Sequence, residues 1–203
     1  MRRASLLQPR SRALQLRGDA EGATIIEFAF AFPVLLLLLM GVLDIGQSVY
    51  VSALLRGAVQ QVARDATVET YDTADLDAYV TSIISGVAPG ATVNVTRKSY
   101  YDYADVERPE TWNDANNNNT CDNGEGYTDE NGNGRWDADI GSEGNGGAND
   151  VVLFDVHVSY KPLFPVPFTD KLGGTRELSA TALKKNQPFA LQEGYGSSAG
   201  TCK

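Results

Sequence analysis

The longest apolar run of the chain extends from Phe28 to Leu43 without a charged residue and has five consecutive leucines at its centre. A helix that crosses a bilayer needs about 20 mostly apolar residues. The run reaches this length only if Ala23 to Glu27 is included, which places the Glu27 carboxylate inside the apolar segment. Charged groups are costly there and usually mark a function. The sequence therefore predicts a transmembrane helix over residues 23–45 with a functional acid near its start, and a plain membrane anchor is the simpler alternative.

Helical spacing of apolar residues continues beyond the membrane segment. The apolar or small side chains that recur every three or four residues are Ile45, Val49, Ser52, Leu55, Val59, Val62 and Ala66. This period is typical of an amphipathic helix. We therefore expect the transmembrane helix to continue as an amphipathic extension over residues 46–70.

The remaining residues, 71–203, show one more helical pattern and three alternating patterns. The helical pattern covers Ala74–Val87, and the strand-like patterns cover residues 91–101, 151–160 and 175–183. A long helix, a short helix and a small antiparallel sheet give an α+β fold class. The segment Leu163–Phe168 alternates prolines with apolar residues and cannot join a central sheet, so it either forms a contact surface or packs on its own sheet. The tail from Asn186 is expected to be flexible unless Cys202 holds it.

The charge distribution orients the chain across the membrane. Residues 1–22 form a basic leader with five arginines against two acids. Since positive charge stays on the cytoplasmic side, we expect a cytoplasmic N-terminus and an external domain after Asp44. The formal net charge of −9 becomes −12 once the leader, with its net +3, is removed. Such an acidic product repels the phosphates of nucleic acid and excludes it as a partner. Cys121 and Cys202 then both lie in an oxidising compartment, as one disulfide or two free thiols.

An acidic insertion, Asp102–Asp150, separates the first two predicted strands and holds 13 of the 26 acidic residues. It has too few apolar residues to build a core, so a disordered loop is one interpretation. The spacing of its oxygen-bearing side chains favours a calcium-binding loop of the EF-hand type. Positions 1, 3, 5, 7, 9 and 12 of such a loop are Asp114, Asn116, Asn118, Thr120, Asp122 and Glu125. Asn119 stands at position 6, where glycine is usual, and Asn tolerates the left-handed conformation required there.

The pattern recurs fifteen residues later at Asp129, Asn131, Asn133, Arg135 and Asp137, now with glycine at position 6. Position 12 is Ile140, so this loop lacks its closing glutamate, and we expect Asp139 or Glu143 to substitute. The oxygen ligands suit calcium better than octahedral magnesium. The sequence therefore predicts calcium as a cofactor, without the flanking helices of an EF-hand. Cys121, at position 8 of the first loop, is a candidate to bond Cys202 and attach the tail to the calcium region.

The sequence contains no catalytic constellation. It has one histidine, His157, on the more polar face of the second predicted strand, and it lacks a nucleophile elbow, a phosphate-binding loop and zinc-ligand spacing. We therefore expect that the protein is not an enzyme.

The segment from Gly22 to Phe28 resembles the processing signal of type IV pilin-like proteins, in which a basic leader and a glycine precede the cleavage site. A cut between Gly22 and Ala23 makes Glu27 the fifth mature residue and Phe28 an aromatic sixth. This start, the leucine-rich span and the helix at Leu54–Ala66 together resemble TadE-like proteins of the tight-adherence (Flp) pilus. Classical pilins and type II secretion pseudopilins usually begin their mature chain with Phe or Met, and Ala23 departs from that pattern.

The resemblance implies a minor pilin or pseudopilin that takes part in the assembly of a tight-adherence type IV pilus. A prepilin peptidase would remove the leader, and the amine exposed on Ala23 of a subunit would meet the Glu27 carboxylate. The protein would be a single-pass protein of the bacterial inner membrane, with its domain in the periplasm or in the pilus. Its partners would be other pilins and the assembly machinery. Two alternatives are a type II secretion pseudopilin and a membrane-anchored surface module that docks a partner through calcium loops like those of dockerins.

Overall fold

The computed structural model describes residues 21–67, 73–165, 174–188, 191–192 and 196–203. Most of the basic leader, the expected boundary near residue 70 and the end of the Leu163–Phe168 segment lie outside the described residues. The elements are α2 (Glu21–Asp65), α3 (Thr73–Val87), β1 (Thr92–Tyr100), the short 3-10 helix η1 (Tyr103–Asp105), β2 (Gly126–Asp129), β3 (Ser142–Glu143), β4 (Val151–Tyr160), β5 (Arg176–Lys185) and β6 (Ser198–Thr201). The α+β fold class is confirmed.

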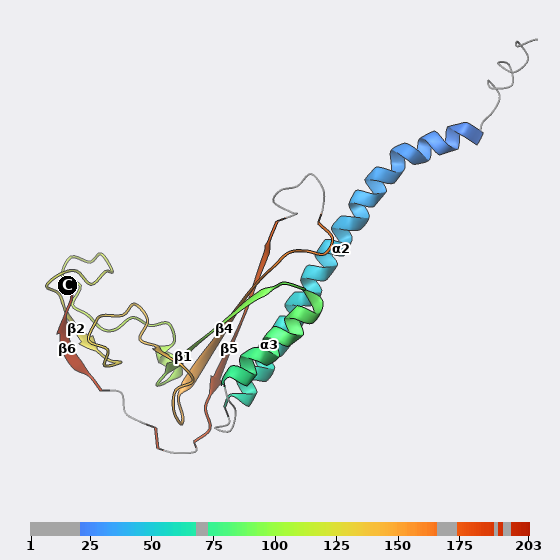
Figure 1. Cartoon of the computed structure of the whole chain (residues 1–203). Coiled ribbons are helices and arrows are strands. Elements are labelled where there is room, and N and C mark those ends of the chain that lie inside the picture. The colour runs from blue at the N-terminus through green and yellow to red at the C-terminus, as the bar shows by residue number, and fades with distance from the viewer. Residues whose placement is uncertain (1–20, 68–72, 166–173, 189–190, 193–195) are drawn as a thin grey trace, which may run out of the picture.

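The predicted transmembrane segment and its amphipathic extension form one continuous helix, α2. Among the described residues it is the one helix long and apolar enough to cross a membrane, by length and composition. Its most apolar stretch has a mean hydropathy of 2.5 and no buried residue, and it projects away from the other elements (Figure 1). The helix ends at Asp65, before the expected Thr70. The Thr67 hydroxyl donates a hydrogen bond to the Arg64 carbonyl (2.7 Å) just beyond this end.

The main hydrophobic core lies between the C-terminal half of α2, α3 and one face of the sheet (Figure 1). The helices contribute Val51, Leu55, Ala58, Val59, Val62, Ala63, Leu76, Val80 and Ile84, and Ala88 just after α3 joins them. Ile45 and Val49, which the helical spacing assigned to the same stripe, are 65% and 64% exposed. α2 therefore contributes to the core only from Val51 onward.

The main sheet has the strand order β3-β1-β4-β5, and its pairings are antiparallel. The central strand β4 buries alternate side chains against the helices, namely Val152, Phe154, Val156, Val158 and Tyr160. This face is the one that the alternation predicts, and His157 is exposed on the other face as expected. β1, β4 and β5 begin and end within two residues of the predicted strands. The period-2 pattern was reliable here because one face of the sheet is covered and the other is open.

The acidic insertion leaves the sheet after β1 and returns at β4. It folds around a second apolar cluster of Tyr100, Ile140 and Val151, with Val106 and Leu153 packed against it. Within the insertion, β2 pairs with β6 at the C-terminus, at the end of the molecule far from the start of α2 (Figure 1). The tail, which was expected to be flexible unless Cys202 holds it, therefore ends in a paired strand next to Cys202.

Candidate functional site

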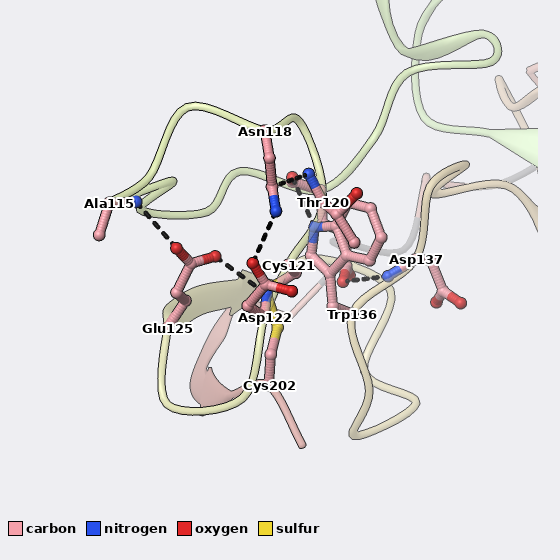
Figure 2. Close-up of a disulfide and its surroundings, with 10 residues drawn as sticks. Ala115, Asn118, Thr120, Cys121, Asp122, Glu125, Trp136, Asp137 and Cys202 are labelled. Atoms are coloured by element: carbon pink, nitrogen blue, oxygen red, sulfur yellow. Dashed lines mark hydrogen bonds between the residues drawn. A yellow bond between two sulfur atoms is a disulfide. The ribbon is translucent and has the colours of Figure 1, made fainter.

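The first calcium-type loop, Asp114–Glu125 (loop 1), is organised by its own polar side chains. The Asp114 carboxylate accepts hydrogen bonds from the backbone N–H groups of Asn118 (3.1 Å) and Asn119 (2.8 Å). The side-chain amides of Asn116 and Asn118 both donate to one oxygen of Asp122, each at 2.7 Å. Positions 3, 5 and 9 of the loop therefore meet at a single point, and Figure 2 shows the Asn118 amide directed at Asp122.

The left-handed turns of loop 1 fall where a cation loop requires them. Asn117 and Asn119, at positions 4 and 6, have φ of 58° and 61°. Asn adopts this conformation more readily than most other residues because its short polar side chain hydrogen-bonds locally. Asn119 thus takes the conformation expected for the usual glycine.

Glu125 closes loop 1 from position 12. Its two carboxylate oxygens accept the backbone N–H of Ala115 at 2.8 Å and the backbone N–H of Asp122 at 3.0 Å. Figure 2 shows this carboxylate connecting the start of the loop to its end. Position 12 therefore holds positions 2 and 9 together.

The second loop, Asp129–Ile140 (loop 2), repeats this construction. The Asp129 carboxylate accepts the backbone N–H groups of Gly132, Asn133 and Gly134. The side-chain amides of Asn131 and Asn133 both donate to one oxygen of Asp137. Gly132 and Gly134, at positions 4 and 6, have φ of 75° and 80°, so the left-handed turns fall at the same positions as in loop 1.

Glu110, which the sequence analysis missed, occupies the closing place in loop 2. One of its oxygens accepts the backbone N–H of Glu130 at 2.7 Å, and the other accepts the backbone N–H of Asp137 at 3.1 Å. These donors are positions 2 and 9 of loop 2, the same positions that Glu125 binds in loop 1. Ile140, at position 12, is instead 7% exposed in the second apolar cluster.

A signal for Glu110 was present in the sequence. Glu110 and Glu125 are separated by the same fifteen residues as Asp114 and Asp129, so each glutamate precedes a first-position aspartate by four residues. The repeat therefore begins with a glutamate, and loop 1 is closed by the glutamate of the second repeat. An ordinary twelve-residue loop carries its closing acid downstream at position 12, so the spacing within loop 2 does not indicate Glu110.

Backbone pairing between the repeats brings Glu110 to loop 2. Trp112 and Tyr127 form an antiparallel bridge. On its two sides, Asn113 N–H donates to the Gly126 carbonyl and Thr128 N–H donates to the Thr111 carbonyl, both at 2.8 Å. The bridged residues are equivalent in the repeat, so the two loops are related by an approximate two-fold axis through this bridge.

The expected substitutes for the closing glutamate, Asp139 and Glu143, lie elsewhere. Asp139 accepts hydrogen bonds from Lys98 Nζ (2.5 Å) and from the Tyr100 hydroxyl (3.1 Å). Burial alone would raise the pKa of Asp139, but the hydrogen bonds from Lys98 and the Gly141 amide and the Lys98 charge lower it overall. Glu143 is exposed in β3. The structure therefore brings Glu110, and neither of these acids, to the closing amides of loop 2.

An ion pair beside Glu110 fixes the segment that carries it. Arg108 donates to both oxygens of Glu130 (3.1 and 2.6 Å) and also to Asp105. The hydrogen bond from Arg108 lowers the pKa of Glu130 to about 2, against the opposing effect of burial. Thr111 adds backbone and hydroxyl donors to the same carboxylate. Glu130 stays ionised at neutral pH and anchors residues 108–111.

The C-terminus is joined to loop 1. Cys121 and Cys202 form a disulfide with a Cα–Cα distance of 5.9 Å, drawn at the centre of Figure 2. Backbone hydrogen bonds join Cys202 to Gly124 (3.0 Å) and to Glu125 (2.9 Å). Position 8 of loop 1 is therefore bonded to Cys202, the residue just after β6. The equivalent position of loop 2 is Trp136.

The donor set suits a hard cation, although no preformed cage is present. Among the described residues, no three His, Cys, Asp or Glu side chains converge closely enough to hold a metal. The loop carboxylates instead accept N–H groups, and half of the expected ligands are amide and backbone oxygens. The Asn amide nitrogens of the two loops face Asp122 and Asp137, while the amide oxygens accept backbone N–H groups two residues further on. Rotation of these amides would direct further oxygens to the same point, as calcium requires.

The candidate assembly site lies at the start of α2. Gly22 and Ala23 are in its first turn, while most of the leader before them lies outside the described residues. Glu27 and Phe28 are exposed on the helix, and the Phe28 ring lies 5.2 Å from the Phe32 ring. Glu27 therefore lies on an exposed apolar surface that a membrane or other helices can cover.

Comparison with known proteins gives one family match, and it lies on this helix. Residues 22–64 match the model of a family described as TadE-like protein. No curated protein and no solved structure matches the chain. The matched segment includes Gly22, Ala23, Glu27 and Phe28 and ends one residue before the end of α2. Residues 22–64 of the chain are therefore similar to the TadE-like proteins.

Proposed function

We infer that the protein is a minor pilin or pseudopilin that takes part in the assembly of a tight-adherence type IV pilus. The single observation that carries this function is the TadE-like match over residues 22–64, which includes the acid at Glu27. The exposed apolar part of α2 supports a single-pass anchor in the bacterial inner membrane. The arginines of the leader support a cytoplasmic N-terminus and a periplasmic or pilus-borne domain.

The proposed maturation step is cleavage between Gly22 and Ala23 by a prepilin peptidase. It exposes an α-amine on Ala23 and leaves Glu27 as its counter-charge in a low-dielectric setting, where an unpaired charge is expensive. N-terminal sequencing of the protein recovered from membranes tests this step and should start at Ala23. A chain that keeps its arginine-rich leader would favour the surface-module alternative and contradict the pilus assignment.

Glu27 is proposed to act in assembly and not in cleavage. The variant Glu27→Ala should be cleaved and inserted normally, while surface pili fall sharply, because only the charge partner of the Ala23 amine is lost. Glu27→Gln is the matched control for side-chain size. Normal piliation of Glu27→Ala would remove the proposed role for this acid.

The acidic insertion is proposed to bind calcium through its Asp, Asn and Glu side chains. The support is the oxygen-only donor set and the left-handed turns at positions 4 and 6 of both loops. Calcium should raise the melting temperature of the full chain in detergent, because a ligand that binds only the folded form stabilises it. At a concentration 100 times the Kd the gain is about 2.7 kcal/mol. Absence of heat and of any melting shift at millimolar calcium, with magnesium as the comparison ion, would remove this claim.

A further inference from the structure

We propose that Glu110 is the closing ligand of loop 2, so that the insertion binds two calcium ions at sites related by its internal two-fold axis. This inference rests on the proposed calcium binding and adds a ligand from outside the loop. Glu125 is the equivalent residue for loop 1, because its carboxylate accepts hydrogen bonds from the same two backbone positions there that Glu110 binds in loop 2.

The burial of Glu110 points to a cation independently of the loop pattern. Its side chain is 0% exposed, and among the described residues no basic side chain lies within ion-pair distance of it. Arg108, two residues before Glu110 in the chain, is paired with Asp105 and Glu130. Buried carboxylates in proteins are ordinarily paired with a base or coordinate a metal, because desolvation of an isolated charge is costly. Hydrogen bonds from three backbone N–H groups hold Glu110 in place but do not neutralise its charge.

Loop 2 also concentrates further negative charge beside Glu110. Asp129 is 3% exposed, and no ion pair involving it is found in the described part of the chain. Asp137 lies 4.0 Å from Arg135, whose side chain is 80% exposed, so solvent screens that pair strongly. Among the described residues, the two buried carboxylates of this loop, Glu110 and Asp129, therefore have no ion pair with a base, and a divalent cation would neutralise both.

The added ligand completes the requirement for calcium. Without a closing acid, loop 2 offers Asp129, Asn131, Asn133, the Arg135 carbonyl and Asp137, which falls short of the six to eight oxygens that calcium takes. A bidentate glutamate adds two oxygens. The segment 108–113 delivers that glutamate because it pairs with residues 126–128 across the Trp112–Tyr127 bridge.

Calcium stoichiometry of the full chain in detergent, measured by equilibrium dialysis, tests the proposal. The native chain should bind two ions, and Glu110→Gln and Glu125→Gln should each bind one. Asp139→Asn, which removes the acid that the sequence suggested, should still bind two. Circular dichroism and the intact disulfide report whether each variant has folded.

Each outcome separates the inference from the function on which it rests. Two ions in Glu110→Gln, or one ion in a native chain that loses it only in Glu125→Gln, would overturn the role of Glu110 and leave calcium binding intact. A native chain that binds no calcium would remove both. If Glu110→Gln fails to fold, Glu125→Gln decides whether loop 2 is a second site, because it changes loop 1 alone: it must still bind one ion, and a folded Glu125→Gln chain that binds none would overturn the proposal.

Discussion

Glu110 and Glu125 lie fifteen residues apart in the chain, and each binds the backbone N–H groups at positions 2 and 9 of a different loop. Glu125 closes the loop that precedes it, whereas Glu110 closes loop 2, which begins nineteen residues further on. The exchange is possible because the repeats pair antiparallel through Trp112 and Tyr127. The two repeats are therefore joined through their backbones, while each loop keeps its own closing glutamate.

The Arg108–Glu130 ion pair should make the insertion sensitive to acid. The pKa of Glu130 falls from 4.5 to about 2 on folding, chiefly through the hydrogen bond from Arg108. Its contribution to stability is therefore complete above about pH 4.5 and is lost as the pH falls toward 2. Glu130→Gln should cost roughly 1–3 kcal/mol at pH 7 and much less at pH 2. Thermal melts of the full chain in detergent across this pH range measure the difference.

Glu143→Gln is the matched control for Glu130→Gln, because Glu143 is an exposed glutamate of β3 in the same insertion. It should change the melting temperature little at either pH. Equal losses of stability for Glu130→Gln at pH 7 and pH 2 would show that the ion pair is not the source of the acid sensitivity.

Loss of the Cys121–Cys202 disulfide should destabilise the insertion and release β6. The bond closes a loop with a sequence separation of 81 residues, and such bonds typically contribute about 2–4 kcal/mol by restricting the unfolded chain. The double variant Cys121→Ser with Cys202→Ser should melt at a lower temperature and expose the C-terminal residues to carboxypeptidase. Resistance equal to that of the native chain would mean that the β2–β6 pairing alone holds the tail.

Gly200 should tolerate no side chain. It pairs with Tyr127 in the β2–β6 ladder, and a Cβ at this position would overlap the Tyr127 ring. Gly200→Ala should therefore separate β6 from β2 and lower the melting temperature of the insertion. Gly196→Ala is the control, because a Cβ there meets no atom within 4 Å. Equal melting temperatures for the two variants would contradict this close contact.

An ion pair between Asp44 and Arg176 joins α2 to the first residue of β5. The Asp44 side chain is 6% exposed and the Arg176 side chain 24% exposed, and the two form an ion pair. Asp44→Asn should cost roughly 1–3 kcal/mol because it removes the charge that the buried Asp44 carboxylate presents to the part-buried Arg176 guanidinium. Adding Arg176→Met should give a total loss smaller than the sum of the two single variants, because both single variants remove the same ion pair. A double variant as unstable as the sum of the single variants would show that the two residues do not interact.

The sequence pattern was sufficient wherever one local period governed burial. The alternation in β4 predicted which face of the sheet is buried, and the uncharged run predicted the exposed apolar part of α2. The helical period predicted the extension of α2 but not where its burial begins. Ile45 and Val49 fit the period and are exposed, because coverage by the sheet and α3 is a tertiary property.

By itself, the sequence determined the anchoring helix, the three main strands and the two repeats of loop side chains, because each depends on neighbours close in the chain. Tertiary structure decided which acid closes loop 2. Glu110 reaches that loop only because the chain folds back on itself at Trp112 and Tyr127. Ile140, at position 12 of loop 2, has no side-chain oxygen and is buried with Tyr100 and Val151. Backbone pairing between distant segments brings charges together that no local spacing reveals.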